Sequence, residues 1–404
     1  MKKMKVLYIG AILRKSWRGG EPVGARNTIK FLEEFGYDIK QSNYESKFGK
    51  VISIFIEIYR KYIGITDAEF FASRFYIKQI KTQNPDIIIS QYDFDTSIVK
   101  AATKANKKII VYTHIWWPVC PKLTLLKWNN ERCKGFHDSD CITCIRLTKN
   151  RNISRYLFNI FKFILEIKST QRKMERRIRN LNSQNVTIVV PSSQMKDYFI
   201  KNGLNGKQIK VIPNGIAPID FIYNLKEKDK IVTYLGGDSE VKGYNIYLEV
   251  AKRVKTLIPD VKFYATGTCE RKVNYINYTG QVDSSSVKEL LTKSRCTVFP
   301  AIWDEPFSIV WLESMASGTP IVTFNTGIAS DVIDNGKNGF IIKTFDIDEM
   351  VLRVTQLVSD DRLFLSMSEN ARKTSVNKFN ETKRINMLND LIFELLFLKN
   401  NNNC

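Results

Sequence analysis

Short runs of β-branched apolar residues recur along the whole chain, and longer segments with helical spacing separate them. Strands buried on both faces of a parallel sheet have such sequences, and the helices between them cover the sheet. The predicted strands are 6–13, 86–90, 108–113 and 186–191 in the first half, and 231–235, 261–265, 297–300, 320–324 and 340–343 in the second. The pattern predicts an α/β fold with doubly wound parallel sheets.

A turn signal near the middle of the chain divides these runs into two groups. Pro213-Asn214-Gly215 follows a further predicted strand, 209–212, and the polar segment 224–230 precedes the second group. A chain of 404 residues has room for about two domains. We therefore expect a Rossmann-like domain over 1–215, a second over 216–385, and a C-terminal helix with a frayed tail over 386–404.

The expected fold also indicates where a ligand would bind. Ligands of doubly wound sheets lie at the carboxyl ends of the strands, and helix N-termini attract phosphate through their free amide N–H groups. If two such domains face a central cleft, these strand ends and helix N-termini line its walls. We therefore expect the functional residues in loops that directly follow strands.

The most informative motif is DEPFSIVWLESMASGTP. Pro306 suits the first position of a helix and Gly318 suits its C-terminal cap, so a helix is predicted from Pro306 to about Ser317. Glu305 then lies at the helix N-terminus, and Glu313 follows about 12 Å along the axis. Two such carboxylates suit hydroxyl groups at the two ends of an extended ligand. Solvated carboxylates of a surface helix are the alternative.

This motif resembles the signature of glycosyltransferase family 4, the retaining enzymes of GT-B fold. The resemblance rests on two glutamates eight residues apart and on the Met-Ala-x-Gly-Thr-Pro that follows them, and it covers about residues 4–360. Other segments match in the expected order: Gly19-Gly20, Phe31–Gly36, Val111–His114, Val190–Ser193, Val211–Gly215, Leu235–Gly237, Lys242-Gly243 and Gly280–Val282. The resemblance implies a GT-B fold, with two Rossmann-like domains facing a central cleft, and a hexosyltransferase.

The resemblance assigns roles to individual residues. Glu313 would hold the ribose hydroxyls of a nucleotide, and Glu305 would bind hydroxyls of the donor sugar. Lys242 would neutralise the diphosphate as it leaves, which stabilises the transition state electrostatically, and His114 would contact the sugar. The implied catalytic residues are His114, Lys242 and Glu305, and the implied donor-binding residues are Gly19, Gly20, Gly237, Lys242, Val282, Glu305, Phe307, Ser308, Ile309 and Glu313.

One position departs from the family pattern. The family usually has Arg five residues before the motif lysine, and this sequence has Gly237 there. Either a basic residue of the first domain, such as Arg18 or Arg26, supplies the missing charge, or the pattern is a subfamily variant. Loss of catalysis is the third alternative, and the presence of Lys242, Glu305 and Glu313 argues against it.

The resemblance implies a nucleotide-diphosphate sugar, such as UDP-glucose or GDP-mannose, as the donor substrate and no cofactor for the chemistry. It implies no carboxylate nucleophile, because the acceptor attacks from the side of the leaving diphosphate. Asp93-Phe94-Asp95 spells the Asp-x-Asp motif of metal-dependent transferases. That motif belongs to a different, single-domain fold, so we predict no metal for the chemistry.

Four cysteines and one histidine crowd into the segment that follows the predicted strand 108–113. Cys120, Cys133, Cys141 and Cys144 have the spacing C-x12-C-x7-C-x2-C, and His137 lies among them. A Cys-x2-Cys pair with two more cysteines can close a tetrahedral zinc site, which would be structural because no ligand position stays open. We predict such a site in an insertion over about 116–146, with disulfides and free thiols as the alternatives.

The positive charge is confined to one part of the sequence. The chain carries 62 Lys and Arg against 41 Asp and Glu, and residues 1–215 hold 39 of the basic and 17 of the acidic residues. An anionic partner is expected for such a half. The stretch 151–180 holds nine basic residues and an apolar stripe at helical spacing, which suits an anionic membrane surface; a helix docked on its own sheet is the alternative.

Together these observations predict a retaining transferase that moves a hexose to a hydroxyl of a glycan acceptor, on a lipid-linked oligosaccharide or polysaccharide precursor. We expect a cytoplasmic protein at the membrane periphery, because the apolar stretch 51–59 is too short to span a bilayer and arginines and lysines follow the first apolar run without a cleavage site. No nucleic acid is expected. The alternative is a basic nucleic-acid- or anion-binding protein of the same fold without catalysis.

Overall fold

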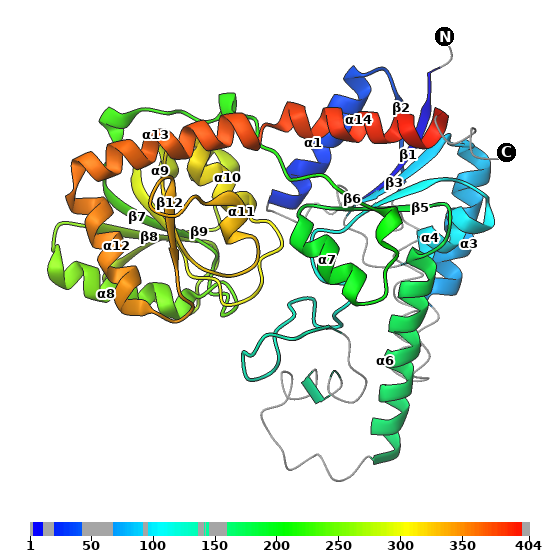
Figure 1. Cartoon of the computed structure of the whole chain (residues 1–404), viewed down its shortest axis with the longest axis horizontal. Helices are drawn as coiled ribbons and strands as arrows, with labels where there is room; N and C mark the ends of the chain where they lie inside the picture. The colour runs from blue at the N-terminus through cyan, green and yellow to red at the C-terminus, as the bar shows by residue number, and fades with distance from the viewer. Residues whose placement is uncertain are drawn as a thin grey trace. The chain divides into compact units, whose positions relative to one another are not determined.

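The computed structural model describes residues 3–10, 20–42, 68–91, 96–135, 141, 143–144 and 160–397, except for the side chains of 20–23, 68–71 and 160–169 (Figure 1). The chain divides into two compact units. Unit 1 comprises residues 1–212 and 385–404, and unit 2 comprises residues 213–384.

Unit 1 contains a six-stranded sheet in the order β2-β1-β3-β4-β5-β6, in which every pairing is parallel. Its strands are β1 (Lys5–Gly10), β2 (Asp38–Ser42), β3 (Ile87–Gln91), β4 (Ile109–Tyr112), β5 (Val186–Val190) and β6 (Ile209–Val211). The residues of β3, β4 and β5 are all buried, which is the environment that their unbroken apolar sequences predict. The strand order reverses between β1 and β3.

The helices of unit 1 cover both faces of this sheet. They are α1 (Gly20–Glu34), α3 (Ala68–Gln83), α4 (Ser97–Lys104), α6 (Ile160–Leu181), α7 (Ser193–Lys201) and most of α14 (Glu381–Phe397). α1 and α14 pack on one face, and α3 and α4 lie together on the other (Figure 1).

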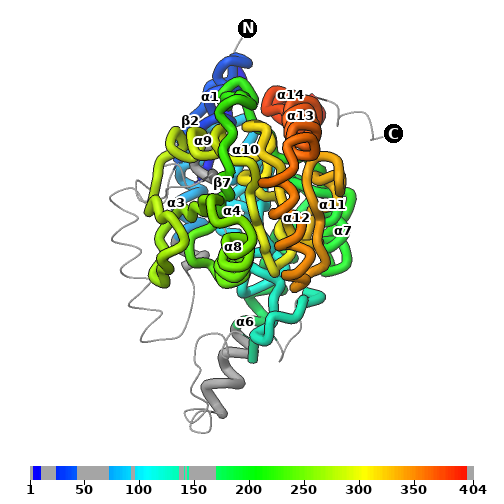
Figure 2. The backbone as a smooth tube through the Cα atoms, turned by 90° about the vertical axis from the view of Figure 1, so that its left-hand side faces the viewer, coloured from blue at the N-terminus to red at the C-terminus, as the bar shows by residue number. Residues whose placement is uncertain are grey.

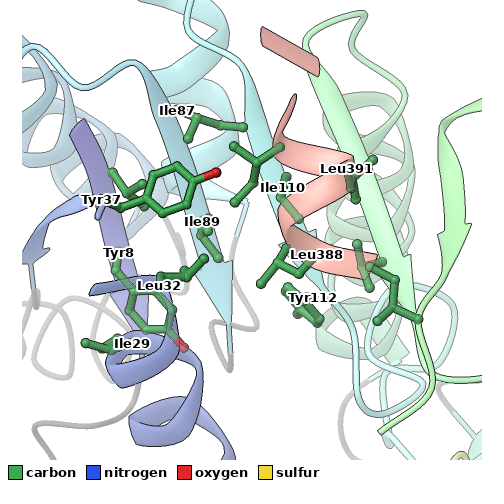
Figure 3. Close-up of a cluster of buried hydrophobic side chains, with 14 of the residues drawn as sticks. Tyr8, Ile29, Leu32, Tyr37, Ile87, Ile89, Ile110, Tyr112, Leu388 and Leu391 are labelled. Atoms are coloured by element: carbon green, nitrogen blue, oxygen red, sulfur yellow. The ribbon is translucent and has the colours of Figure 1, made fainter. Parts of the chain in front are cut away.

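The C-terminal helix α14 completes the core of unit 1. Leu388, Leu391, Ile392 and Leu395 pack against Tyr8, Ile87, Ile89, Ile110 and Tyr112 of the sheet and against α1 (Figure 3). Burying each of these leucines stabilises the unit by about 1.5–3 kcal/mol relative to exposure. The Tyr37 hydroxyl also donates to Asn389 Oδ1 at 2.8 Å. The last part of the chain therefore belongs to the same unit as the first strand.

Unit 2 contains a second parallel sheet of six strands in the order β12-β11-β10-β7-β8-β9. The strands are β7 (Asp229–Leu235), β8 (Lys262–Thr266), β9 (Ile276–Gly280), β10 (Ser294–Phe299), β11 (Ile321–Phe324) and β12 (Gly339–Ile342). The order reverses between β7 and β10, as in the Rossmann fold. The prediction of two Rossmann-like doubly wound domains is confirmed.

Helices also cover both faces of the second sheet. They are α8 (Tyr244–Leu257), α9 (Ser284–Lys293), α10 (Ile309–Ala316), α11 (Ala329–Val332), α12 (Ile347–Ser359) and α13 (Asp361–Lys378). α8 and α12 pack side by side (Figure 2), and α10 packs between α9 and α13. In the part of the chain that the structure describes, no helix is long and apolar enough to cross a bilayer.

Candidate functional site

The switch point of the second sheet brings two predicted site residues together. Lys242 lies in the loop that follows β7, and Glu305 lies in the loop that follows the neighbouring strand β10. The Lys242 ammonium is close enough to lower the pKa of Glu305, although burial raises that pKa more, to about 7. The carboxyl ends of strands at a switch point form the crevice in which such folds bind ligands.

Backbone contacts fix these two loops against each other. The Ile302 N–H donates to the carbonyl oxygen of Val241 at 3.0 Å. Gly243 adopts a φ of +81°, and a Cβ there would lie 2.0 Å from the carbonyl oxygen of Pro300. A side chain at position 243 would therefore drive the loops apart, and glycine is required next to Lys242.

Glu305 is buried with one carboxylate oxygen unsatisfied. Glu305 is 8% exposed, and its Oε2 makes no hydrogen bond to any residue that the structure describes. The Trp303 N–H lowers the Glu305 pKa, yet its Nε1 makes no hydrogen bond within the described ranges either. An unpaired buried polar group costs about 1–3 kcal/mol. Hydroxyl groups of a bound ligand would satisfy both atoms.

A glycine from the next strand holds the backbone of Glu305. Gly327 follows β11 with a φ of +53°, and a Cβ on it would lie 2.1 Å from the carbonyl oxygen of Glu305. The Gly327 N–H donates to Asp304 Oδ1 at 3.0 Å. The position of the carboxylate thus depends on a residue 22 positions further along the sequence.

The helix of the motif begins later than the sequence predicted. α10 begins at Ile309 with Ser308 as its N-cap, so Pro306 is not its first residue. Phe307 is buried against Phe379, with ring centroids 5.6 Å apart, and Ile328 N–H contacts the carbonyl of Glu305 at 3.4 Å. These tertiary contacts hold the chain outside the helix until Ser308. The free amides of the helix N-terminus are consequently those that start at Ile309.

Glu313 lies one turn inside α10 and is half-buried. Burial raises its pKa to about 7, and the Lys288 ammonium on α9 opposes that shift. The Lys288 Nζ also lies 3.8 Å from Asp220 Oδ2 and 4.8 Å from the centre of the Phe221 ring. Sequence reasoning missed Lys288, whose distance from the motif gives no local signal.

The loop at Gly237 packs directly on the loop that follows β8. Gly237 N–H donates to the Thr266 carbonyl at 2.9 Å, its φ is +63°, and a Cβ would lie 3.2 Å from the Thr268 carbonyl oxygen. An arginine here would be strained, which favours the subfamily variant as the reason for its absence. Val282, half-buried before α9, follows Gln281, whose Nε2 lies 3.3 Å from Thr268 Oγ1.

The predicted residues of unit 1 are described only in part. Gly20 begins α1 and Arg26 is exposed on it, whereas Gly19, Arg18 and the Asp93–Asp95 motif lie outside the described residues. His114 follows β4; its Nε2 lies 3.1 Å from Gln91 Nε2, and its ring stacks on Tyr112 with centroids 5.8 Å apart. The sequence analysis did not single out Gln91, although its place at the end of β3 was a signal.

The predicted zinc site is not assembled by its four cysteines. The described residues, which include Cys120, Cys133, Cys141 and Cys144, contain no group of three or more His, Cys, Asp or Glu placed to hold a metal ion. Cys133 Sγ donates to the Gly135 carbonyl at 3.1 Å and Cys144 Sγ to the Leu126 carbonyl at 3.6 Å, so these thiols are directed at backbone oxygens instead. His137 lies outside the described residues.

Two family models match successive parts of the chain. The model described as Glycosyltransferase Family 4 matches residues 39–218, and the model described as Glycosyl transferases group 1 matches residues 216–374. The second match contains Lys242, Glu305 and Glu313. The chain belongs to glycosyltransferase family 4.

Curated relatives of this chain are similar over part of their length. A galactosyltransferase of Escherichia coli, UDP-Gal:alpha-D-GlcNAc-diphosphoundecaprenol alpha-1,3-galactosyltransferase, is 29% identical over 48% of this chain and 56% of its own length. The poly(ribitol-phosphate) alpha-N-acetylglucosaminyltransferase of Staphylococcus aureus is 26% identical over 50% of this chain and 42% of its own. The chain therefore spans about half the length of such relatives.

Solved structures match the fold over nearly the whole chain. A glycosyltransferase from Rickettsia africae superposes with a TM-score of 0.67 at 15% identity, covering 99% of this chain and 100% of that one. The Anabaena protein HepE in complex with UDP-glucose gives 0.63 at 13% identity, covering 96% and 99%. The fold is therefore that of the GT-B glycosyltransferases.

Proposed function

We propose that this chain is a retaining hexosyltransferase that uses a nucleotide-diphosphate sugar. The observation that carries the proposal is the pairing of Lys242 with the buried, incompletely hydrogen-bonded Glu305 at the switch point of unit 2. A buried carboxylate with an unused acceptor atom suits sugar hydroxyls, and a neighbouring ammonium suits the diphosphate beside them.

We assign the main chemical groups of the nucleotide sugar to residues of the chain as follows. Glu305 accepts hydrogen bonds from hydroxyls of the sugar, and Glu313 accepts them from the ribose. Lys242 and the amides around Phe307, Ser308 and Ile309 stabilise the charge that grows on the diphosphate. The donor-binding roles that the family resemblance implies for Gly19, Gly20, Gly237, Val282 and His114 stay predictions. UDP-glucose and GDP-mannose are the first donors to test.

The proposed chemistry needs no protein nucleophile. The bond between the anomeric carbon and the diphosphate oxygen breaks while the acceptor oxygen bonds to the same face of the sugar, so the anomeric configuration is retained. The acceptor proton passes to the leaving diphosphate. The Lys242 ammonium stabilises the negative charge that develops on this diphosphate as the bond breaks. Glu305 and Glu313 bind the donor in their ionised forms, because only a carboxylate accepts through both oxygens.

We infer that the acceptor is a glycan linked to a membrane lipid. The excess of 22 positive charges within residues 1–215 supports an anionic partner, and the Escherichia coli relative is named for a diphosphoundecaprenol-linked acceptor. Arg172, Lys173 and Arg179 of α6 are exposed. The enzyme would then act at the periphery of the membrane, on its cytoplasmic face.

The donor proposal is tested by thermal shift and by turnover. Nucleotide sugars are added to the full chain, and the one that raises the melting temperature is followed for sugar transfer or hydrolysis. Glu305→Ala is expected to abolish both effects with the fold intact, while Glu249→Ala, at an exposed position of α8, retains them. Normal turnover by Glu305→Ala would refute the proposal.

The acceptor proposal has a separate test. Vesicles with acidic lipid are sedimented with the chain at physiological salt, beside vesicles of neutral lipid. We expect the chain to sediment with the acidic vesicles and not with the neutral ones. If it sediments with neither, the proposal of a lipid-linked acceptor is refuted. A basic anion-binding protein without catalysis is the alternative, motivated by Gly237; it predicts vesicle or nucleic-acid binding with no turnover of any nucleotide sugar.

A further inference from the structure

The C-terminal end of α10 is held by side chains from other segments of unit 2. The helix ends in a Schellman motif, in which Gly318 adopts a left-handed φ of +66°. Such a motif leaves the carbonyls of its last residues to other donors. Here the Ala316 carbonyl accepts from Arg372, the Ser317 carbonyl from Lys228 and the Gly318 carbonyl from Ser368.

Lys228 precedes β7 and joins the end of α10 to the end of α9. Its Nζ donates to the Ser317 carbonyl, to the Leu291 carbonyl in the last turn of α9 and to Thr319 Oγ1, at 2.7–2.8 Å. The Lys228 residue is 7% exposed, so these bonds are shielded from water. A neutral amine keeps two N–H groups, so the bonds to both carbonyls form whether the nitrogen is charged or not.

This link lies one helical turn beyond two charged residues of the same helices. On α9, Leu291 follows Lys288 by three residues. On α10, Ser317 follows Glu313 by four residues. Residues at these spacings lie on the same face of a helix. The Lys288 ammonium is close enough to Glu313 to oppose the rise that burial causes in the Glu313 pKa.

We propose that Lys228 is a positioning residue that holds Lys288 of α9 beside Glu313 of α10, and thereby keeps the Glu313 carboxylate able to bind the donor substrate. The role of Glu313 in binding the ribose rests on the proposed function. The placement of Lys288 rests only on contacts within unit 2. Lys228 itself is buried between the two helix ends and would not touch the substrate.

The position of α9 relative to α10 matters because two carboxylates compete for Lys288. Its Nζ also lies 3.8 Å from Asp220 Oδ2, on the segment that leads to β7. If α9 moved away from α10, the Lys288 ammonium would stay with Asp220 and leave Glu313. Arg372 of α13 adds a further cation at the end of α10, but its bonds go to α10 and to the same segment, not to α9. Lys228 bonds to both helices.

Titration of the Glu313 carboxyl tests this placement without any substrate. Carbon NMR follows the full-length protein labelled with ¹³C-glutamate, and the spectrum of Glu313→Gln assigns the signal. Lys228→Met should raise the titration midpoint by about one pH unit, the effect of losing a nearby cation. In a Lys288→Met background it should add nothing, which separates the displacement of Lys288 from a direct effect of the Lys228 charge.

Ser368→Ala is the matched control. It removes the donor to the Gly318 carbonyl at the same helix end, and it leaves the bonds from Lys228 to α9 and α10 in place. We expect the Glu313 midpoint to stay unchanged in this variant. If Lys228→Met does not fold, Lys228→Gln, which keeps an amide donor, takes its place with a smaller rise expected.

Turnover of a nucleotide sugar tests the consequence for binding. The Glu313 pKa is about 7, so a rise of one pH unit lowers the ionised fraction at pH 7.5 about threefold. Lys228→Met should therefore raise KM about threefold at pH 7.5 and hardly at pH 9, where the carboxyl is ionised in both proteins. We expect kcat to stay unchanged, because the ribose is remote from the bond that breaks. A helix end that is merely loosened would raise KM equally at both pH values.

Each result has a defined consequence. An unchanged midpoint in Lys228→Met, the same rise in the Lys288→Met background, or an equal rise in Ser368→Ala overturns the positioning role. A raised midpoint with an unaltered KM, or a KM raised equally at both pH values, overturns its link to donor binding. If the parent turns over no nucleotide sugar, the proposed function fails whatever the midpoint.

Discussion

The raised pKa of Glu305 predicts that this carboxylate destabilises the free protein. Burial raises the pKa to about 7 from an ordinary value of 4.5. Between these two pH values the folded state binds the proton more tightly than the unfolded state, so stability falls as pH rises through this window. One pKa unit is worth about 1.4 kcal/mol, and the full penalty above pH 7 is therefore about 3 kcal/mol.

Glu305→Gln removes the charge and keeps the shape of the side chain. We expect the variant to be about 3 kcal/mol more stable than the parent at pH 8 and within about 0.5 kcal/mol of it at pH 4.5, where the folded carboxyl is protonated and the unfolded carboxyl is half protonated. Sugar transfer should be lost at both pH values. Greater stability together with lost activity is the usual exchange at a binding site.

The assay must report on unit 2 alone, because a chain with two units need not unfold in one step. Hydrogen exchange across a urea series, read from peptides of β7 and β10, gives the free energy of unfolding of that unit at each pH. Glu249→Gln, on the exposed face of α8, is the matched control. A Glu305→Gln variant that is no more stable than the parent at pH 8 would refute the reasoning.

Three further substitutions test the packing around the site and the core. Gly327→Ala should destabilise unit 2 and abolish the thermal shift that a nucleotide sugar causes, because its Cβ would meet the Glu305 backbone. Gly336→Ala is the control: its φ is also positive, +79°, but the space around it is open, so the thermal shift should remain. A normal thermal shift in Gly327→Ala would contradict the role of Gly327 in supporting Glu305. Lys228→Met should cost about 2–4 kcal/mol in a urea titration, since the Lys228 Nζ donates to three buried oxygens at 2.7–2.8 Å; a neutral effect would show that these oxygens find other donors. Leu391→Ala should lower the free energy of unfolding of unit 1 by about 2–5 kcal/mol, because α14 packs in that unit. Hydrogen exchange should therefore become faster in β1 and β3 and stay unchanged in β10. Faster exchange in β10 alone would be inconsistent with that packing.

The sequence was most informative where strands are buried in the middle of a sheet. β3 and β5 were predicted to within one residue at each end, because a strand covered on both faces needs a nearly unbroken apolar run. β2 and β9 were missed. Both are edge strands, and their sequences DIKQS and INYTG mix polar with apolar residues because part of each strand faces solvent.

The candidate site was predicted in part, for a similar reason. The spacing of Glu305 and Glu313 and the presence of Lys242 are local features that the sequence displays. The late start of α10 was not predictable, because the contacts that delay it come from Phe379 and from the loop after β11. Gln91 was missed as well, since its contact with His114 exists only once β3 and β4 lie side by side.

The sequence by itself determined the class of fold, the family and the charged residues of the candidate site, because periodicity and motif spacing are properties of short segments. Only the tertiary structure decided which of these residues meet. The approach of Lys242 to Glu305, the glycine that supports Glu305, the return of α14 to unit 1 and the hydrogen bonds of His114 all join residues far apart in the chain. Such contacts depend on how the strands are ordered and how the helices pack, and no local pattern of residues encodes that order.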